Sequence, residues 1–237
     1  MDEYAIEARG LIRTFDDGTG IRGVDIKVAP GEVHALVGLN GAGKSTLMRL
    51  LLGMLQPATG TVTICGRQLN RTDWRQVGHL VEYPLAYREL TCRQNLTLGA
   101  RLHGVPPTAI EAMVETAIEE LRLTQYADRR TGKLSLGNRQ RLGLASALQH
   151  DPRLIILDEP TNTLDPAGVI LLREALVRRA DAGAAVLVSS HHLDEVARIA
   201  HRISVLNAGR IIGTLDPHGV DIERSFFDLV HSDDMAA

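Results

Sequence analysis

The sequence contains no long apolar segment. Nowhere in its 237 residues is there a run of about eighteen apolar residues, the length that a membrane-spanning helix needs. The stretch 1–10 carries Asp2, Glu3 and Glu7, where a secretory signal would have basic residues followed by an apolar core. We therefore expect a chain that does not span a membrane and that stays in the cytoplasm.

Cysteine, lysine and net positive charge are also scarce. Cys65 and Cys92 lie far apart and belong to no CxxC or neighbouring His pattern, which favours buried thiols over a metal or redox site. A formal charge of −3 argues against a partner made of nucleic acid, because neutralising phosphates usually needs a basic excess. Lysine occurs only at Lys27, Lys44 and Lys133, so Lys44 is conspicuous among the glycines around it.

The pattern of apolar residues indicates one large α/β domain. Strand-like runs fill the first third, at 3–8, 20–28, 32–37, 60–65 and 78–81. Residues 91–149 turn helical, and Thr108 with Glu111 is expected to form a capping box. Behind that box, one face of the helix carries an apolar stripe made of Ile110, Met113, Val114, Ala117, Ile118 and Leu121.

The final third alternates strands and helices. Two short apolar runs, 154–157 and 185–188, flank a helix that Asp165 and Pro166 should start and Gly183 should stop. Residues 202–213 read as a closing hairpin. Short apolar strands separated by helices are typical of a parallel sheet that is covered on both faces.

Residues 38–45, GLNGAGKS, match the phosphate-binding pattern G-x-x-x-x-G-K-[ST]. The match follows the strand 32–37 and precedes a helical run, as this motif requires. Glycines let backbone N–H groups surround phosphates at a helix N-terminus, Lys44 adds a charge for the β- and γ-phosphates, and Ser45 offers Mg²⁺ a hydroxyl. The expected nucleotide-binding residues here are Gly38, Asn40, Gly41, Ala42, Gly43, Lys44, Ser45 and Thr46.

Two carboxylates end the apolar run 154–157. Asp158 is placed to hold Mg²⁺, through water, at the carboxyl edge of a parallel sheet. Glu159 is placed to accept a proton from the attacking water or to orient it. The plain alternative for Glu159 is a solvated charge at the end of a strand.

Together these motifs resemble the ABC ATPase family over residues 15–213. The segment Leu134–Asn138 is similar to the family's LSGGQ signature and departs from it at Leu136 and Asn138. Further matches are the Walker B pair at 158–159, the D-loop at 163–165, the switch histidine His191, and Phe15 where an aromatic ring stacks on adenine. For Phe15 the alternative is a core residue.

The resemblance implies a P-loop NTPase (RecA-like) α/β core with an N-terminal antiparallel β subdomain. It places an inserted α-helical subdomain at about 84–150 and a short extension at about 214–237, all within a single domain, 1–237. It also implies a homodimer that sandwiches two ATP molecules with Mg²⁺. Ser135, Gly137 and Asn138 of one subunit would meet the γ-phosphate held by the other, where Lys44, Glu159 and His191 are the catalytic residues.

Glu82 stands where most of the family has glutamine, as a third metal-binding candidate beside Ser45 and Asp158. With Leu136, it resembles the branch that includes bacitracin-type and lantibiotic-type resistance exporters. That branch implies an ATPase powering export of a drug, antibiotic or peptide through a separate integral membrane subunit, at the inner face of the cell membrane. Residues 83–87 would contact that subunit, unless they are core of the helical subdomain.

Three other functions are compatible with parts of the sequence. The ATPase of an importer or of a cluster-assembly machine shares all these motifs. An ABC ATPase acting on chromosomes or ribosomes would carry a second P-loop or a long coiled-coil insertion, and neither is visible. A small-molecule kinase would use Lys44 and Asp158 but would leave the signature and His191 without a role.

Overall fold

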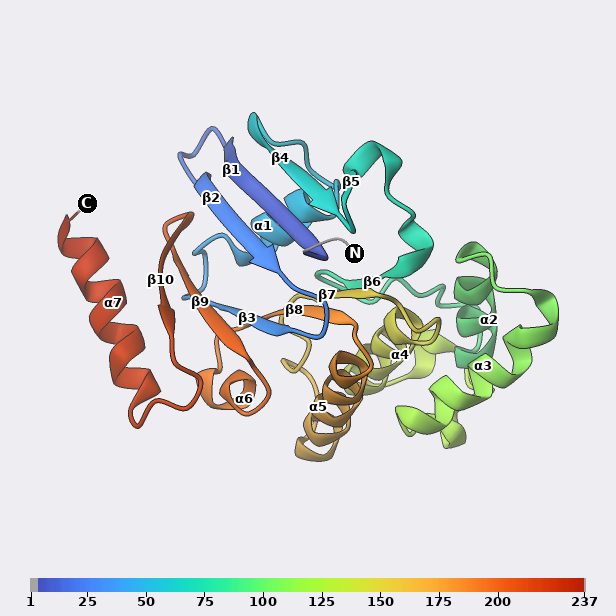
Figure 1. Cartoon of the computed structure of the whole chain (residues 1–237). Coiled ribbons are helices and arrows are strands. Elements are labelled where there is room, and N and C mark those ends of the chain that lie inside the picture. Colours follow the sequence, from blue (N-terminus) through green and yellow to red (C-terminus); the bar gives the residue numbers. More distant parts are fainter. Residues whose placement is uncertain (1–3, 237) are drawn as a thin grey trace.

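The computed structural model describes residues 4–236 and is built around two β-sheets (Figure 1). The first sheet is antiparallel, in the order β2-β1-β4-β5. Its strands are β1 (Ile6–Thr14), β2 (Gly20–Val28), β4 (Thr59–Ile64) and β5 (Arg67–Gln68). The second sheet has the order β10-β9-β3-β8-β7-β6 and is parallel except at its β10 edge.

The strands of the second sheet are short and buried. They are β3 (Val33–Val37), β6 (Val77–Leu80), β7 (Leu154–Leu157), β8 (Ala185–Ser190), β9 (Arg202–Asn207) and β10 (Arg210–Leu215). Every residue of β3, β7 and β8 is buried, as expected for parallel strands covered on both faces. The predicted α/β P-loop fold with an antiparallel β portion is therefore confirmed.

Two hydrophobic cores occupy the two faces of the parallel sheet. Helix α1 (Lys44–Leu51) lies between the two sheets and buries Leu47, Met48 and Leu50 there. The other face is covered by α4 (Leu136–Leu148), α5 (Pro166–Asp181) and α6 (Leu193–Ala197), and α2 (Cys92–Leu102) and α3 (Pro107–Glu120) extend that core. Helix α7 (Ile222–Ala236) lies alongside β10 (Figure 1). No helix described between residues 4 and 236 is both long and apolar enough to cross a bilayer.

The predicted capping box at Thr108 and Glu111 is wrong. Helix α3 starts two residues earlier than this box requires, with Pro106 as N-cap and Pro107 in its first turn, and no side chain caps it. Two prolines already fix the extended entry and the first helical φ, which leaves Thr108 inside the helix. The capping box of this region lies at Thr91, whose hydroxyl accepts from Gln94 N at 3.2 Å, ahead of α2.

The first strand extends further than its apolar pattern indicated. Glu3, the start of the predicted run 3–8, lies outside the described residues, and β1 continues to Thr14. Its register shifts between Ala8 and Leu11, a bulge at which Gly10 takes a φ of 57°. Of the two thiols expected to be buried, Cys92 is buried and Cys65 is half-buried.

Candidate functional site

The glycine-rich loop joins β3 to α1, as its sequence pattern predicted. A Cβ on Gly38 would lie 2.3 Å from the carbonyl oxygen of Leu206, so only glycine fits at this close approach of two backbones. Gly43 has a φ of 109° and is the N-cap of α1, where it provides no side-chain cap. The first turn of α1, which contains Ser45 and Thr46, therefore presents its N-terminal N–H groups to the loop.

The loop is open on its outer side. Asn40 and Gly41 are exposed, Ser45 and Thr46 are half-buried, and Ala42 is buried against the fold. A Cβ on Gly41 would meet nothing within 4 Å. This combination leaves room for a polyanion against the backbone amides of the loop.

Lys44 folds back over this loop. Its side chain is only 6% exposed, and its Nζ donates to the carbonyl oxygens of Gly38 at 2.7 Å and Leu39 at 3.3 Å. The same Nζ forms an ion pair with Glu159 Oε1 at 3.2 Å. The structure thus brings together the lysine of the loop and the second carboxylate after the apolar strand, which are 115 positions apart in the sequence.

The two carboxylates at the end of β7 have different partners. Asp158 is buried and its Oδ1 accepts from Ser189 Oγ at 2.6 Å. The same Ser189 oxygen accepts from Glu159 N at 2.8 Å, so one hydroxyl on β8 links both residues. The motif that contains His191 begins at Ser189, but the sequence pattern did not indicate a role for this serine.

Glu159 sits between Lys44 and His191. Its Oε2 lies 2.8 Å from His191 Nδ1 and accepts from His191 N at 3.3 Å. Its backbone has a φ of 45°, a left-handed conformation that non-glycine residues rarely adopt and that is common at functional sites. The carboxylate, the histidine and the lysine therefore form one contiguous polar chain above the loop.

Glu82 makes a contact that the sequence did not indicate. It follows β6 with a φ of 68°, and its carboxylate pairs with Arg49 of α1. The Glu82 side chain is 49% exposed and the Arg49 side chain 31%. Glu82 thus lies beside the helix that carries Ser45, and its carboxylate is already paired with the Arg49 guanidinium.

The signature residues lie at the N-terminus of α4. Ser135 is exposed and caps this helix, because its Oγ accepts from Asn138 N at 3.2 Å. Gly137 lies close to the D-loop, where an added Cβ would meet Thr163 O at 2.8 Å. Arg141 on the next turn binds Asp165 and holds the pKa of that carboxyl below its usual range.

Phe15 is half-buried and directly follows β1, which ends at Thr14. The Arg13 guanidinium lies 5.5 Å from its ring centroid, and Phe15 N donates to Thr19 O at 2.9 Å to close a tight loop. Neither contact makes Phe15 a core residue, since it is absent from both buried clusters.

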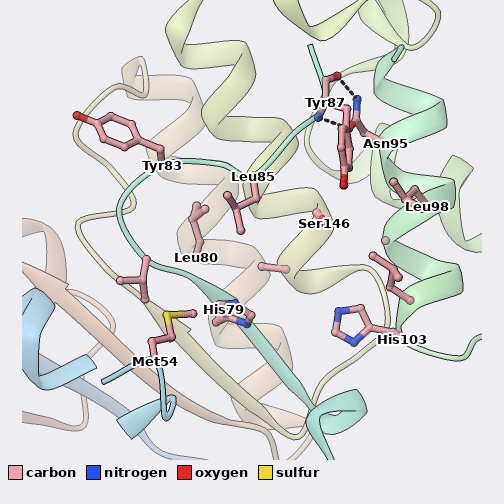
Figure 2. A pocket seen from close by; sticks show the side chains of 15 residues that line it. Met54, His79, Leu80, Tyr83, Leu85, Tyr87, Asn95, Leu98, His103 and Ser146 are labelled. Carbon is pink, nitrogen blue, oxygen red and sulfur yellow. Dashed lines mark hydrogen bonds between the residues drawn. The ribbon is translucent and has the colours of Figure 1, made fainter. Parts of the chain in front are cut away.

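A separate groove of about 320 Å³ lies between the sheet and the helical segment (Figure 2). Its apolar wall includes Met54, Leu80, Leu85, Leu98 and Leu102, and its polar wall His79 and His103. Burial lowers the pKa of both histidines and so favours their neutral form. Figure 2 shows Tyr87 held at its backbone by Asn95, through bonds of 2.8 Å and 3.1 Å.

The apolar side chains above this groove are exposed. Tyr83 is 78%, Leu85 94% and Tyr87 62% exposed. The alternative that 83–87 forms the core of the helical segment is therefore wrong for these three side chains. The chain bends outward here, so they meet solvent instead of α2 and α4.

Comparisons with known proteins agree with this geometry. A family model described as ABC transporter matches residues 21–162. The Nod factor export ATP-binding protein I of Rhizobium sp. (strain N33) is 35% identical over 223 residues, which cover 93% of this chain and 73% of that protein. The lantibiotic transport ATP-binding protein SrtF of Streptococcus pyogenes is 35% identical over 207 residues, covering 87% of this chain and 89% of that protein.

Two solved structures extend the comparison to the fold. One, described as the ATP binding subunit of an ABC transporter, superposes with a TM-score of 0.84 at 29% identity and covers 98% of both chains. The other is cbiO1 from Clostridium perfringens, part of the ABC transporter complex cbiONQ, with a TM-score of 0.78 at 25% identity over 99% of this chain and 96% of that chain.

Proposed function

We propose that this chain, which belongs to the ABC transporter family, hydrolyses ATP to export a drug, antibiotic or peptide through a separate membrane subunit. ATP-binding proteins of this family are ATPases that power transport, and the chain is such an ATP-binding subunit. One relative is named for Nod factor export, which supports export over import, and another is named for lantibiotic transport, which supports an antibiotic or peptide as the transported compound. What the chain itself exports is part of the proposal.

ATP is proposed to bind with its phosphates in the loop 38–46. The support is the open, glycine-lined backbone at the N-terminus of α1, together with a lysine whose charge already faces the loop. Lys44 would exchange the Gly38 and Leu39 carbonyls and Glu159 for the β- and γ-phosphates. The half-buried Phe15 ring would stack on the adenine.

The donor set of the site fits Mg²⁺. It offers the Ser45 hydroxyl in the first turn of α1 and the Asp158 carboxylate directly after β7, both hard oxygen ligands. Among residues 4–236 no three or more His, Cys, Asp or Glu side chains gather as a metal site, and Mg²⁺ needs none, since it binds through one or two carboxylates, phosphates and water. When bound, the metal would neutralise charge that develops on the phosphates.

Glu159 is the proposed general base. Its carboxylate is held by His191 at 2.8 Å and would be released by Lys44 when the phosphates arrive. The released oxygen could accept a proton from a water attacking the γ-phosphate, while His191 reports whether that phosphate is present. Through its two hydrogen bonds, the Ser189 hydroxyl would hold the Asp158 side chain and the Glu159 backbone in fixed positions relative to each other.

The arrangement favours a homodimer with shared sites. Helices α1 and α4 pack on opposite faces of the parallel sheet, and Ser135 and Leu136 at the start of α4 are exposed. A second copy could bring these signature residues over the loop of the first. Lys44→Ala and Ser135→Ala subunits, each inactive alone, should then recover part of the ATPase rate when mixed, because half of the composite sites in a heterodimer are intact.

That mixing experiment tests the shared site directly. The rate is followed while one variant is titrated into the other, and crosslinking verifies that heterodimers form. Lys44→Ala mixed with a second preparation of Lys44→Ala is the control, since it contains no intact site. Heterodimers that show no more activity than this control would contradict the proposal.

The groove in Figure 2 is the proposed contact with the membrane subunit, which would hold the chain at the inner face of the membrane. The main support is that exposed apolar side chains gather beside a groove whose walls are largely apolar. Tyr87→Asp should abolish recruitment to vesicles that contain the membrane subunit and leave ATP binding intact. Phe227→Asp is the control, because that exposed ring lies on α7, away from the groove. Equal recruitment of both variants would argue against this surface.

A further inference from the structure

The turn between β9 and β10 lies directly behind the phosphate loop. Gly209 N donates to Ala42 O at 2.9 Å, and Gly209 Cα lies 3.6 Å from where a Cβ on Gly43 would be. On its other side, Gly209 O accepts from Arg22 N at 2.8 Å in β2. The turn is therefore wedged between the loop and the antiparallel sheet.

The backbone of this turn is tightly constrained. Ala208 and Gly209 have φ values of 43° and 79°, the left-handed pair of a two-residue hairpin turn. A Cβ on Gly209 would lie 2.0 Å from Gly20 O, so the backbones are in van der Waals contact. A displacement of the turn would be passed on to Ala42 and Gly43, because no side chain lies between them to absorb it.

The last turn of α7 holds this hairpin turn from outside. Asn207, 8% exposed, donates through Nδ2 to Asp233 Oδ2 at 3.0 Å and to Asp234 Oδ1 at 2.8 Å. Asp233 also pairs with Arg210 at 3.3 Å, so its carboxylate bridges the residues that precede and follow the turn. Helix α7 is itself fixed to the core by Phe226 and Val230.

We propose that Asp233 and Asp234 are positioning residues for the phosphate loop, acting through Asn207 and the β9–β10 turn on Ala42 and Gly43. Charge-assisted hydrogen bonds to a buried amide are strong and directional, and here they come from a helix anchored to the core. The C-terminal helix thus sets how well the loop amides are placed for a phosphate. The inference rests on the proposed binding of nucleotide at residues 38–46.

The test is the double variant Asp233→Ala/Asp234→Ala. We expect its Kd for ADP, measured by titration calorimetry, and its KM for ATP to rise on the order of fivefold, the lower end of couplings between separate sites. The kcat at saturating ATP should stay within about twofold of wild type, since a loosened loop weakens ground-state and transition-state binding alike. A helix that merely added stability would lower the Tm without separating KM from kcat in this way.

Asp228→Ala is the matched control, because Asp228 is exposed on the same helix and pairs with Arg224 one turn away. Wild-type values of Kd and KM in the double variant, or an equal rise in Asp228→Ala, would overturn the proposal. If the double variant fails to fold, Asp234→Ala alone keeps the Asp233–Arg210 pair and should show a smaller rise in the same direction; no rise there would also overturn it. Failure of the wild type to bind ADP would instead count against the nucleotide site itself.

Discussion

Replacing Glu159 by glutamine separates the two tasks that the structure gives to this side chain. In the structure the Glu159 carboxylate lies 3.2 Å from Lys44 Nζ and 2.8 Å from His191 Nδ1. In the proposed reaction it accepts a proton from water. Glutamine has nearly the same shape and can keep one oxygen toward Lys44, but it cannot serve as a base.

The two expected effects have opposite signs. Loss of the general base should slow hydrolysis by about a hundredfold or more. ATP binding should instead be kept or tightened, because Lys44 must leave Glu159 before it reaches a phosphate. A charge-assisted hydrogen bond contributes about 1 kcal/mol more than a neutral one, so weakening this competing contact should tighten ATP binding by at most about fivefold.

Phosphate release under steady state and equilibrium binding of ATP measure these effects separately. Glu174→Gln is the control for loss of one carboxylate, since Glu174 is exposed on α5. Hydrolysis within about threefold of wild type would refute the assignment of Glu159 as the base. Weaker ATP binding in Glu159→Gln would refute the competition for Lys44.

Three further predictions concern other parts of the chain. Glu82→Gln should change the stability of the fold by no more than about 1 kcal/mol, because the ion pair of Glu82 with Arg49 is partly exposed. The same variant should weaken the apparent Mg²⁺ affinity and change the ATPase rate at saturating Mg²⁺ and ATP by less than about tenfold. A fall in that rate as deep as the one expected for a lost general base would make Glu82 a catalytic residue. Burial lowers the pKa of His34 to about 4, so the unfolded state binds more protons between pH 6.5 and 4 and stability falls as pH falls through that window. His150 has a similarly lowered pKa, so urea unfolding of His34→Gln should still show a loss of stability from pH 7 to 5, but one smaller than that of the wild type by about 2 kcal/mol. Thr91→Ala should cost about 1 kcal/mol of stability by the same assay and Thr108→Ala close to nothing, whereas equal costs would contradict the observed caps.

The local motifs of the chain could be predicted from the sequence because each rests on short-range physics. A buried five-residue strand followed by GLNGAGKS has few alternatives to a strand, a loop and a helix N-terminus. Likewise, Asp165 and Pro166 start α5 as predicted, since the N-cap and first-turn rules involve only neighbouring residues. Thr108 failed as a cap for a local reason too, because two preceding prolines had already set the helix start.

Tertiary structure alone decided which distant side chains meet. The contacts of Lys44 with Glu159, of Glu82 with Arg49 and of Asn207 with Asp233 join segments that share no periodicity or spacing in the sequence. Parallel sheet order creates the first of these contacts: β3, β8 and β7 are neighbours in the sheet but far apart along the chain, so their carboxyl ends converge only after folding. The sequence determined the loop and the carboxylates as chemical groups, whereas the order of the strands determined that a lysine, a base and a histidine share one site.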